Sequence, residues 1–373
     1  MTSHTRDTYG RALFEDIQKQ PNPFAKKGTS ERIATLLSLL IIGFSLAGLV
    51  AGVYGLIKWN NSPLIIFICV LILLISWLSR PRPNRLSKQV MSLAAASHPQ
   101  IHKIFNHIAK EMGIDQPIQY ALSPNFEAYI TEIGWRRTPV VVIGYPLFFA
   151  CTAEEMTALV AHELAHCRNR DIRRSGWVAH ACRILINWSD MLNPDKHENE
   201  SGLLHLITNG IMRILFWIPY SLLYLLIHLF WNQSQRAEYE ADRIAAQLAG
   251  SDAMISMLQT VHLDHVYKMV VGKLTLQKQN ANMWERLLDT FSSVPEKEKT
   301  RILRILEKSD MSLDTTHPST FLRIAMIRQD PHRPLYQISK EDYERMCSEI
   351  NTPAIEKMEH RIIETYRAQY LSG

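Results

Sequence analysis

The sequence has 373 residues and a formal net charge of +5, from 41 Lys and Arg against 36 Asp and Glu. This small, dispersed surplus excludes a typical nucleic-acid-binding protein, and the 47% of hydrophobic residues excludes a disordered chain, a collagen and a small disulfide scaffold. These averages conceal one strongly apolar region, residues 33–79, in which Lys58 is the only charged residue.

Two uncharged runs in this region, Ile33–Ile57 and Pro63–Ser79, predict a transmembrane helical hairpin that follows an N-terminal segment, residues 1–32. The first run would form a helix of about 37 Å, which is enough to cross a bilayer, and the second is near the lower limit of length. Small residues recur every four positions in the first run, and we expect a partner helix to pack against them. They are Gly43, Ala47, Ala51 and Gly55.

Basic residues flank both ends of this hairpin, whereas its connecting loop contains Lys58 alone. By the positive-inside rule, both ends and the chain that follows are expected in the cytoplasm. The five cysteines are odd in number and include no CxxC pair, which agrees with a reducing compartment.

The remaining chain predicts a mainly α-helical body with a small β-sheet, an α+β fold. Residues 86–112 have apolar positions at helical spacing, and two short runs, Ile118–Leu122 and Pro139–Gly144, predict strands. A capping box begins a predicted helix, Thr152–Arg170, and a further helix is predicted at Arg236–Leu248.

The first of these helices contains the pattern HExxH, formed by His162, Glu163 and His166. Residues four apart lie on one face of a helix, so both imidazoles can reach one Zn²⁺. Glu163 lies beside them, where it can deprotonate a water molecule at the metal. A catalytic zinc usually has a third protein ligand, and Glu238 and Asp242 on the next helix are both candidates. Their spacing does not choose between them.

Two motifs together carry a family resemblance: HExxHxxxxD, which ends at Asp171, and ExxAD, from Glu238 to Asp242. The pair resembles the HtpX-like family of integral-membrane zinc metallopeptidases, whose relatives include the CAAX prenyl-protein proteases. The resemblance covers roughly residues 90–330 and implies a zincin-like metalloprotease body with one Zn²⁺ per chain. It also implies that Asp242 and Asp171 support the ligand side chains. The implied metal ligands are His162, His166 and Glu238.

The resemblance also implies a substrate-binding site. The loop Asn125–Ala128 resembles the one that precedes the substrate-binding edge strand of the family. A substrate backbone would add to this strand through main-chain hydrogen bonds. Glu127 in the loop departs from the small residue of the family, and Gln235 stands where the family has Arg, so the expected substrate preference is affected. The residues of the implied edge strand are Val140, Val141, Val142 and Ile143.

A downstream segment, Thr316–Pro318 with Arg323–Ile324, resembles a further element of the family. By this resemblance His317 would either donate to the oxyanion or act as an inhibitory fourth zinc ligand. Glu163 would take a proton from water and deliver it to the leaving amine, without a covalent intermediate.

A second apolar zone, Ile214–Trp231, separates His166 from Glu238. Because both residues must reach one metal, the chain between them crosses the bilayer an even number of times. If this zone spans the membrane, Ile172–Trp188 must span it too, and otherwise neither spans. We favour two further crossings, with Met191–Ser201 outside the cytoplasm.

The predicted domains are therefore the hairpin, a metallopeptidase domain at residues 80–335 with a membrane-inserted or membrane-associated insertion at about 172–231, and a helical tail at 336–373. We expect a membrane-anchored zinc endopeptidase of a bacterial-type inner membrane, with its catalytic domain in the cytoplasm. It would hydrolyse membrane or misfolded proteins in quality control, in contact with the lipid bilayer and without nucleic acid. The alternatives are a regulatory protease that cleaves a signalling protein and a non-catalytic zinc-binding scaffold.

Overall fold

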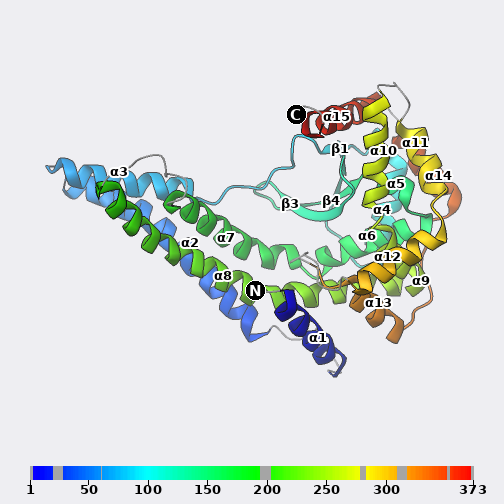
Figure 1. The fold of residues 1–373 in the computed structure, drawn as a ribbon, viewed down its shortest axis with the longest axis horizontal. Helices are drawn as coiled ribbons and strands as arrows, with labels where there is room; N and C mark the ends of the chain where they lie inside the picture. Colours follow the sequence, from blue (N-terminus) through cyan, green and yellow to red (C-terminus); the bar gives the residue numbers. More distant parts are fainter. Residues whose placement is uncertain are drawn as a thin grey trace. The chain divides into compact units, whose positions relative to one another are not determined.

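The computed structural model describes residues 3–19, 28–59, 61–193, 203–277, 283–308, 317–350 and 353–370. The chain divides into two compact units (Figure 1). One unit, here called the sheet unit, consists of Met1–Pro23, Pro83–Ile172 and Ala237–Gly373. The other, here called the helical unit, consists of Phe24–Arg82 and Arg173–Arg236.

A four-stranded mixed sheet lies within the sheet unit, in the order β1-β2-β4-β3. β2 and β4 are parallel, whereas β1 pairs with β2, and β3 pairs with β4, in the antiparallel sense. The strands are β1 (Met91–Leu93), β2 (Gln119–Ser123), β3 (Ala128–Ile133) and β4 (Thr138–Gly144). The mainly helical body with a small sheet is thus confirmed.

The expectation that Val140–Ile143 form an edge strand is wrong. Val140 pairs with Gln119 of β2 on one side and with Thr131 of β3 on the other, so β4 is a central strand. Its uninterrupted β-branched run is the composition of a strand that is buried on both faces. The edges of this sheet are β1 and β3, and every residue of β3 is half-buried.

One helix of the sheet unit is shorter than predicted. Residues 86–112 do not form one helix: β1 and turns occupy the first part, and the helix begins at Pro99, where proline is well tolerated. The helices of the sheet unit are α1 (Ser3–Lys19), α4 (Pro99–Glu111), α5 (Leu147–Ala150), α6 (Ala153–Arg168), α9 (Ser251–Thr260), α10 (Asp264–Gln277), α11 (Met283–Ser292), α12 (Glu296–Lys308), α13 (Thr320–Gln329), α14 (Lys340–Ile350) and α15 (Pro353–Tyr370).

The predicted capping box fixes the start of α6. Thr152 Oγ1 accepts the amide N–H of Glu155 at 3.3 Å, and Glu155 Oε2 accepts the amide N–H of Thr152 at 3.0 Å. The other oxygen of Glu155 accepts hydrogen bonds from Ser256 and Thr260, which attach α9 to the same helix end. α6 is buried along nearly its whole length, so its side chains are held by packing on several sides.

The C-terminal helices pack into this core. Tyr343 of α14 donates to the carbonyl of Cys151 at 2.9 Å. The carboxylate of Glu349 accepts the amide N–H groups of Gln100 and Ile101 at the start of α4. Glu359 of α15 accepts a hydrogen bond from the hydroxyl of Tyr145, which directly follows β4.

The helical unit contains α2 (Thr29–Lys58) and α3 (Pro63–Leu78), together with most of α7 (Asp171–Leu192) and α8 (Leu203–Ala249). α2 and α3 form the predicted hairpin, and buried apolar residues of α2, α7 and α8 pack into one cluster. Trp188 of α7 also donates its indole N–H to the hydroxyl of Ser79 at 3.0 Å.

The small residues that contact α3 differ from those expected. A Cβ atom at Gly48 would overlap Ser76, and one at Gly52 would overlap Leu73. In contrast, a Cβ atom at Gly43 would meet no atom of another part of the described chain within 4 Å. Of the four predicted small residues only Gly55 is at the contact, because the close face runs through Gly48, Gly52 and Gly55.

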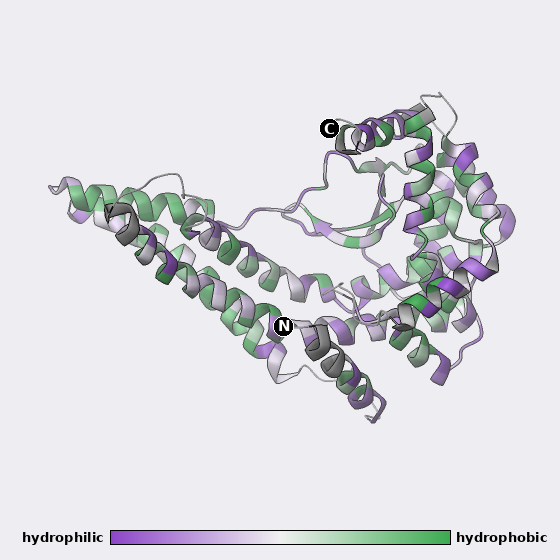
Figure 2. Cartoon of the chain, viewed as in Figure 1, coloured by the Kyte–Doolittle hydropathy of each residue, from purple (hydrophilic) through white to green (hydrophobic). Residues whose placement is uncertain are grey.

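Two helices of the described chain are long and apolar enough to cross a membrane, α2 and the Thr208–Ala249 part of α8. Only 28% and 11% of their most apolar windows are buried, unlike the core helix of a soluble protein. α3 is a shorter apolar helix, and apolar residues cover much of the outer surface of this unit (Figure 2). The segment predicted outside the cytoplasm, Met191–Ser201, lies largely outside the described residues, and the number of crossings stays a prediction.

Candidate metal centre

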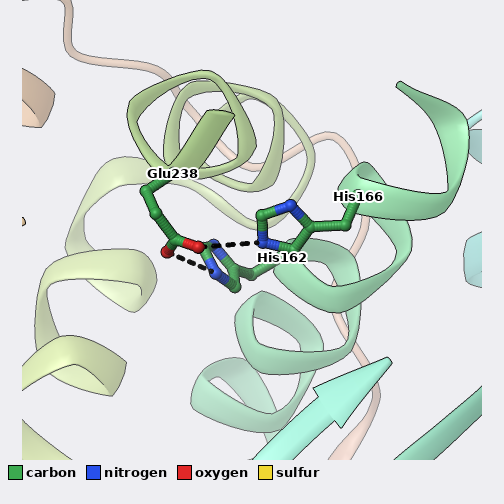
Figure 3. Close-up of side chains that lie close together, drawn as sticks. All are labelled: His162, His166 and Glu238. Carbon is green, nitrogen blue, oxygen red and sulfur yellow. Dashed lines mark ion pairs between the residues drawn. The ribbon is translucent and has the colours of Figure 1, made fainter. Parts of the chain in front are cut away.

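α6 and α8 bring three potential metal ligands to one point inside the sheet unit (Figure 3). The Nε2 atoms of His162 and His166 each lie 3.5 Å from a carboxylate oxygen of Glu238. The nearest nitrogen and oxygen atoms of all three residues lie within 4.8 Å of one another. The i, i+4 spacing on α6 thus has the predicted effect, since both imidazoles face the same carboxylate.

The other ring nitrogens of the two histidines face carboxylates. His162 Nδ1 lies 3.0 Å from Asp242 Oδ1, and His166 Nδ1 hydrogen-bonds Asp171 Oδ2 at 3.2 Å. Arg170, with φ of 60°, lies between the end of α6 and Asp171, the first residue of α7. A carboxylate at Nδ1 favours the tautomer whose Nε2 lone pair is free for a metal.

Behind His162, Asp242 is held by a buried arginine. Arg323 of α13 donates from Nη2 to Oδ1 at 2.6 Å and from Nε to Oδ2 at 2.7 Å, and both side chains are less than 10% exposed. Burial alone would raise the pKa of Asp242, but the Arg323 cation and His162 lower it below its usual value. Asp242 therefore stays ionised and is fixed in orientation.

The charges at the centre are strongly coupled. Burial lowers the pKa of His162, whereas the contacts with Asp242 and Glu238 raise it more, giving a pKa of about 10 in the metal-free protein. Burial raises the pKa of Glu238, but His162 and His317 hold it well below its usual range. A buried anionic centre of this kind stabilises positive charge, which is supplied either by a proton on the imidazole or by a cation.

His317 lies at the rim of this centre, with its side chain 47% exposed. Its Nδ1 is 2.7 Å from Glu238 Oε2. The structure therefore brings His317 to the predicted site, and both expected roles of this residue remain predictions. Thr316, the first residue of the downstream motif, lies outside the described residues.

Glu163 is 7% exposed and lies on α6 between the two histidines in sequence. Its charge contributes to raising the pKa of His166, although burial acts on that pKa first and in the opposite direction. Its role as a base stays a prediction.

The expected substrate residues are distributed differently from the prediction. Asn125 is exposed in the loop that leads into β3, and its side-chain amide donates to Glu127 Oε1 at 3.0 Å. β3 lies alongside α6. The sequence interpretation missed β3, although its alternation of apolar and polar residues (Ala-Tyr-Ile-Thr-Glu-Ile) is typical of a half-buried strand. Arg323, which belongs to the downstream motif, pairs with Asp242.

The donor set fits zinc. Two imidazoles and one carboxylate are the ligands of a known class of catalytic zinc site, in which a fourth position is left for water or substrate. All three side chains are mostly buried, and the Nδ1 atoms of both imidazoles are already opposed by carboxylates. These residues could hold one zinc ion per chain with little rearrangement.

The sequence pattern of Peptidase family M48 matches residues 95–330, which is more than half of the chain and contains every residue of this centre. The chain belongs to peptidase family M48. The resemblance to HtpX-like proteins is therefore confirmed, while α14 and α15 lie beyond the part that the M48 pattern matches.

Several relatives of this M48 member are named Protease HtpX. The one from Pseudomonas putida (strain GB-1) is 27% identical over 186 residues, which are 47% of this chain and 60% of that protein. The one from Pseudomonas savastanoi pv. phaseolicola is 27% identical over 56% of this chain and 71% of its own length, and the one from Stutzerimonas stutzeri is 25% identical over 62% and 82%. The chain thus spans about 60% of the length of the first of these relatives. No solved structure matches the chain.

Proposed function

We propose that the protein is a membrane-anchored zinc metalloendopeptidase that hydrolyses peptide bonds of membrane or misfolded proteins. The convergence of His162, His166 and Glu238 on one point carries this proposal. Membership of family M48 and the name Protease HtpX of its relatives support it.

The proposed metal ligands are His162, His166 and Glu238. When bound, zinc would supply a Lewis acid that polarises the scissile carbonyl and makes water a better nucleophile at neutral pH. Glu163 takes the proton from water and delivers it to the leaving amine. Asp242 and Asp171 hold the two imidazoles in the orientation that directs Nε2 toward the metal position. His317, at the rim, is placed to donate to the oxyanion.

We propose β3, not β4, as the strand that receives the substrate backbone. β4 is paired on both sides, whereas β3 is paired on one side only within the described part of the chain and lies alongside the HExxH helix. Main-chain hydrogen bonds to a free edge bind peptides of many sequences, which suits a protease that acts on varied damaged proteins.

For the membrane, we propose four crossings by α2, α3, α7 and α8, with the sheet unit in the cytoplasm. In the chain, His166 and Asp171 precede the apolar parts of α7 and α8, and Glu238 follows them. All three residues nevertheless belong to one site. The chain between them therefore crosses the membrane an even number of times. A reporter fused after Met191 would lie outside the cytoplasm, and a cytoplasmic reporter would contradict four crossings.

The decisive experiment uses the full chain purified in detergent with fluorescent casein as the substrate. Glu163→Gln is expected to lower the rate by a factor of about 10²–10⁴ because it removes the base but keeps the shape of the side chain. Glu154→Gln is the matched control, since Glu154 is exposed in the first turn of the same helix. A zinc chelator should stop cleavage by the unmodified chain, and added zinc should restore it.

Metal analysis tests the ligand set separately. We expect one zinc per unmodified chain, loss of zinc in Glu238→Ala and retained zinc in Glu240→Ala, two residues along the same helix. Undiminished cleavage by Glu163→Gln would refute the mechanism, and full zinc content in Glu238→Ala would refute the ligand assignment. Bound zinc without any hydrolysis would instead favour the non-catalytic scaffold.

A further inference from the structure

A cavity of about 610 Å³ lies in the sheet unit, and none of the three proposed metal ligands lines it. Its walls come from the segment that leads into β1, the loop between β2 and β3, α10 and α15 (Figure 1). Met91, Val271, Met358 and Ile362 give it an apolar interior. A cavity of this size can hold several side chains of a bound peptide.

The rim of this cavity is positively charged. Four basic residues line it, Lys88, Lys268, Lys357 and Arg361, against one acid, Glu364. Lys268 pairs with Asp264 at 2.6 Å, and Glu364 lies 3.4 Å from His360. Across the described residues, Lys88, Lys357 and Arg361 have neither an ion pair nor a hydrogen bond. These three cations can therefore each interact with a negatively charged ligand without losing a partner within the chain.

Hydrogen bonds and packing hold the walls of the cavity in place. Tyr267 of α10 donates to the carbonyl of Pro124 at 2.8 Å, which connects α10 to the loop before β3. Phe126 in the same loop packs against Tyr267. Glu359, next to Met358, is buried and hydrogen-bonded to Tyr145, which fixes α15. The wall formed by α15 lies beyond residues 95–330, so the M48 match does not account for it.

The position of the cavity relates it to the proposed substrate strand. Asn125 lines the cavity and lies three residues before Ala128, the first residue of β3. A peptide that adds to β3 in the antiparallel sense, the more stable pairing, runs from the Ile133 end toward the Ala128 end. Its carboxyl-terminal part then leaves the strand beside Asn125. At about 3.4 Å per residue, three to five further residues would extend roughly 10–17 Å beyond the strand.

We propose that this cavity binds acidic side chains of the polypeptide substrate, in the part of the substrate that follows the segment added to β3. The occupant is an acidic peptide segment because the rim is cationic, the interior is apolar and the cavity continues the path of β3. The proposal rests on the proposed function in one respect, the addition of substrate to β3. It makes α15 a determinant of sequence preference for an enzyme whose strand addition is otherwise tolerant of sequence.

Direct binding tests the cavity without requiring hydrolysis. The full chain with Glu163→Gln is titrated with fluorescent peptides that are identical except for Glu or Gln at successive positions along the peptide. We expect the Glu peptide to bind about 10-fold more tightly than the Gln peptide at one or two adjacent positions, and this ratio to decrease at high salt. Lys357→Glu with Arg361→Glu should abolish or reverse the ratio, and Lys357→Gln with Arg361→Gln should reduce it toward one. Lys340→Glu on α14, outside the cavity, is the charge-matched control and should keep the ratio.

Equal binding of Glu and Gln peptides at every position would overturn the proposal. A preference for Glu that persists in both double variants would overturn it too, because the preference would arise elsewhere. If the double variants change binding of the full chain to inorganic phosphate or to nanodiscs with anionic lipid, but not the peptide ratio, the occupant is not a peptide. The binding experiments use Glu163→Gln throughout, so they do not depend on hydrolysis. Absence of cleavage by the unmodified chain would reject the proposed function, and the peptide-binding ratio would still decide whether the cavity binds acidic side chains.

Discussion

Asp242 and Arg323 form a buried two-point ion pair directly behind His162, with N···O distances of 2.6 and 2.7 Å. Asp242 also lies 3.0 Å from His162 Nδ1, so one carboxylate connects the arginine to a proposed metal ligand. The pair joins α13 to α8 and to α6. The orientation of His162 therefore depends on a residue 161 positions further along the chain.

Asp242→Asn should weaken zinc binding. The amide keeps the shape of the carboxylate but removes the charge that orients and polarises His162, a change that typically costs 10–100-fold in metal affinity. Asp171→Asn is the comparison, and a smaller loss is expected because its side chain is 15% exposed, against 1% for Asp242. Competition with a zinc chelator measures both affinities, and equal affinity in Asp242→Asn and the unmodified chain would contradict the assigned role.

Arg323→Met should lower the free energy of unfolding by about 3–5 kcal/mol, because it leaves a buried carboxylate without its cation. The double variant Arg323→Met with Asp242→Asn should be more stable than the sum of the two single changes predicts. Arg328→Met, an exposed change on the same helix, should alter stability by less than about 0.5 kcal/mol. Thermal or denaturant unfolding in detergent gives the three values.

The stability of the metal-free protein should depend on pH through His162. Burial acts to lower the pKa of His162, but Asp242 and Glu238 raise it to about 10, above the usual 6.5. A raised pKa means that the protonated imidazole stabilises the fold: this contribution is complete below about pH 6.5 and is lost as the pH rises toward 10. Zinc must displace that proton, so zinc affinity should increase with pH over the same window.

The measurement compares the melting temperature of the metal-free chain with that of metal-free His162→Gln between pH 6 and pH 10. The difference should be largest at the acid end of the window and decrease toward pH 10. A constant difference across the window would show that protonation of His162 does not stabilise the fold.

Peptide binding should slow amide hydrogen exchange in β3 and leave the exchange in β4 unchanged. In β4 both sides are already paired, so its amides exchange slowly with or without substrate. A peptide bound to Glu163→Gln should slow the exchange of those β3 amides that face the free edge. Hydrogen exchange followed by mass spectrometry separates the two strands, and new protection that appears only at β1 would move the substrate to the opposite edge of the sheet.

Gly52→Ala should destabilise the hairpin of α2 and α3. The added Cβ would overlap Leu73 and lies close to the carbonyl of Cys69, a contact that backbone cannot easily relieve. Overpacking of this kind costs about 1–3 kcal/mol. Gly43→Ala is the matched control in the same helix, because the Cβ added there would meet no atom of another described segment within 4 Å. Thermal inactivation of the detergent-solubilised chain should be faster only for Gly52→Ala.

Features with a local cause were predictable from the sequence. The start of α6 follows from the reciprocal hydrogen bonds of Thr152 and Glu155, and the common direction of His162 and His166 follows from their spacing. The choice between Glu238 and Asp242 was not local. Glu238 and Asp242 lie one turn apart on α8. Which of the two carboxylates faces the Nε2 atoms of His162 and His166 depends on the position of α8 along α6, and tertiary packing sets that position.

The edge strand was assigned wrongly for a physical reason. A strand with one free edge and partial exposure alternates polar and apolar residues, and a central strand does not need to. Val140–Ile143 was the most obvious β run because it is central, whereas Thr131 and Glu132 obscured β3. The contact face of α2 was misplaced in a similar way, since an apolar helix offers several small-residue rows and only the partner helix selects one.

The C-terminal helices close the core through Tyr343, Glu349 and Glu359, all of which follow Arg323, the last charged residue of the site, in the chain. At about 5–20 residues per second, a ribosome makes Glu359 a few seconds after Arg323. During that interval the growing chain contains every proposed zinc ligand but cannot yet fix the end of β4 or the start of α4. Assembly of the core of the sheet unit therefore waits for segments that are synthesised after all the residues of the candidate metal centre.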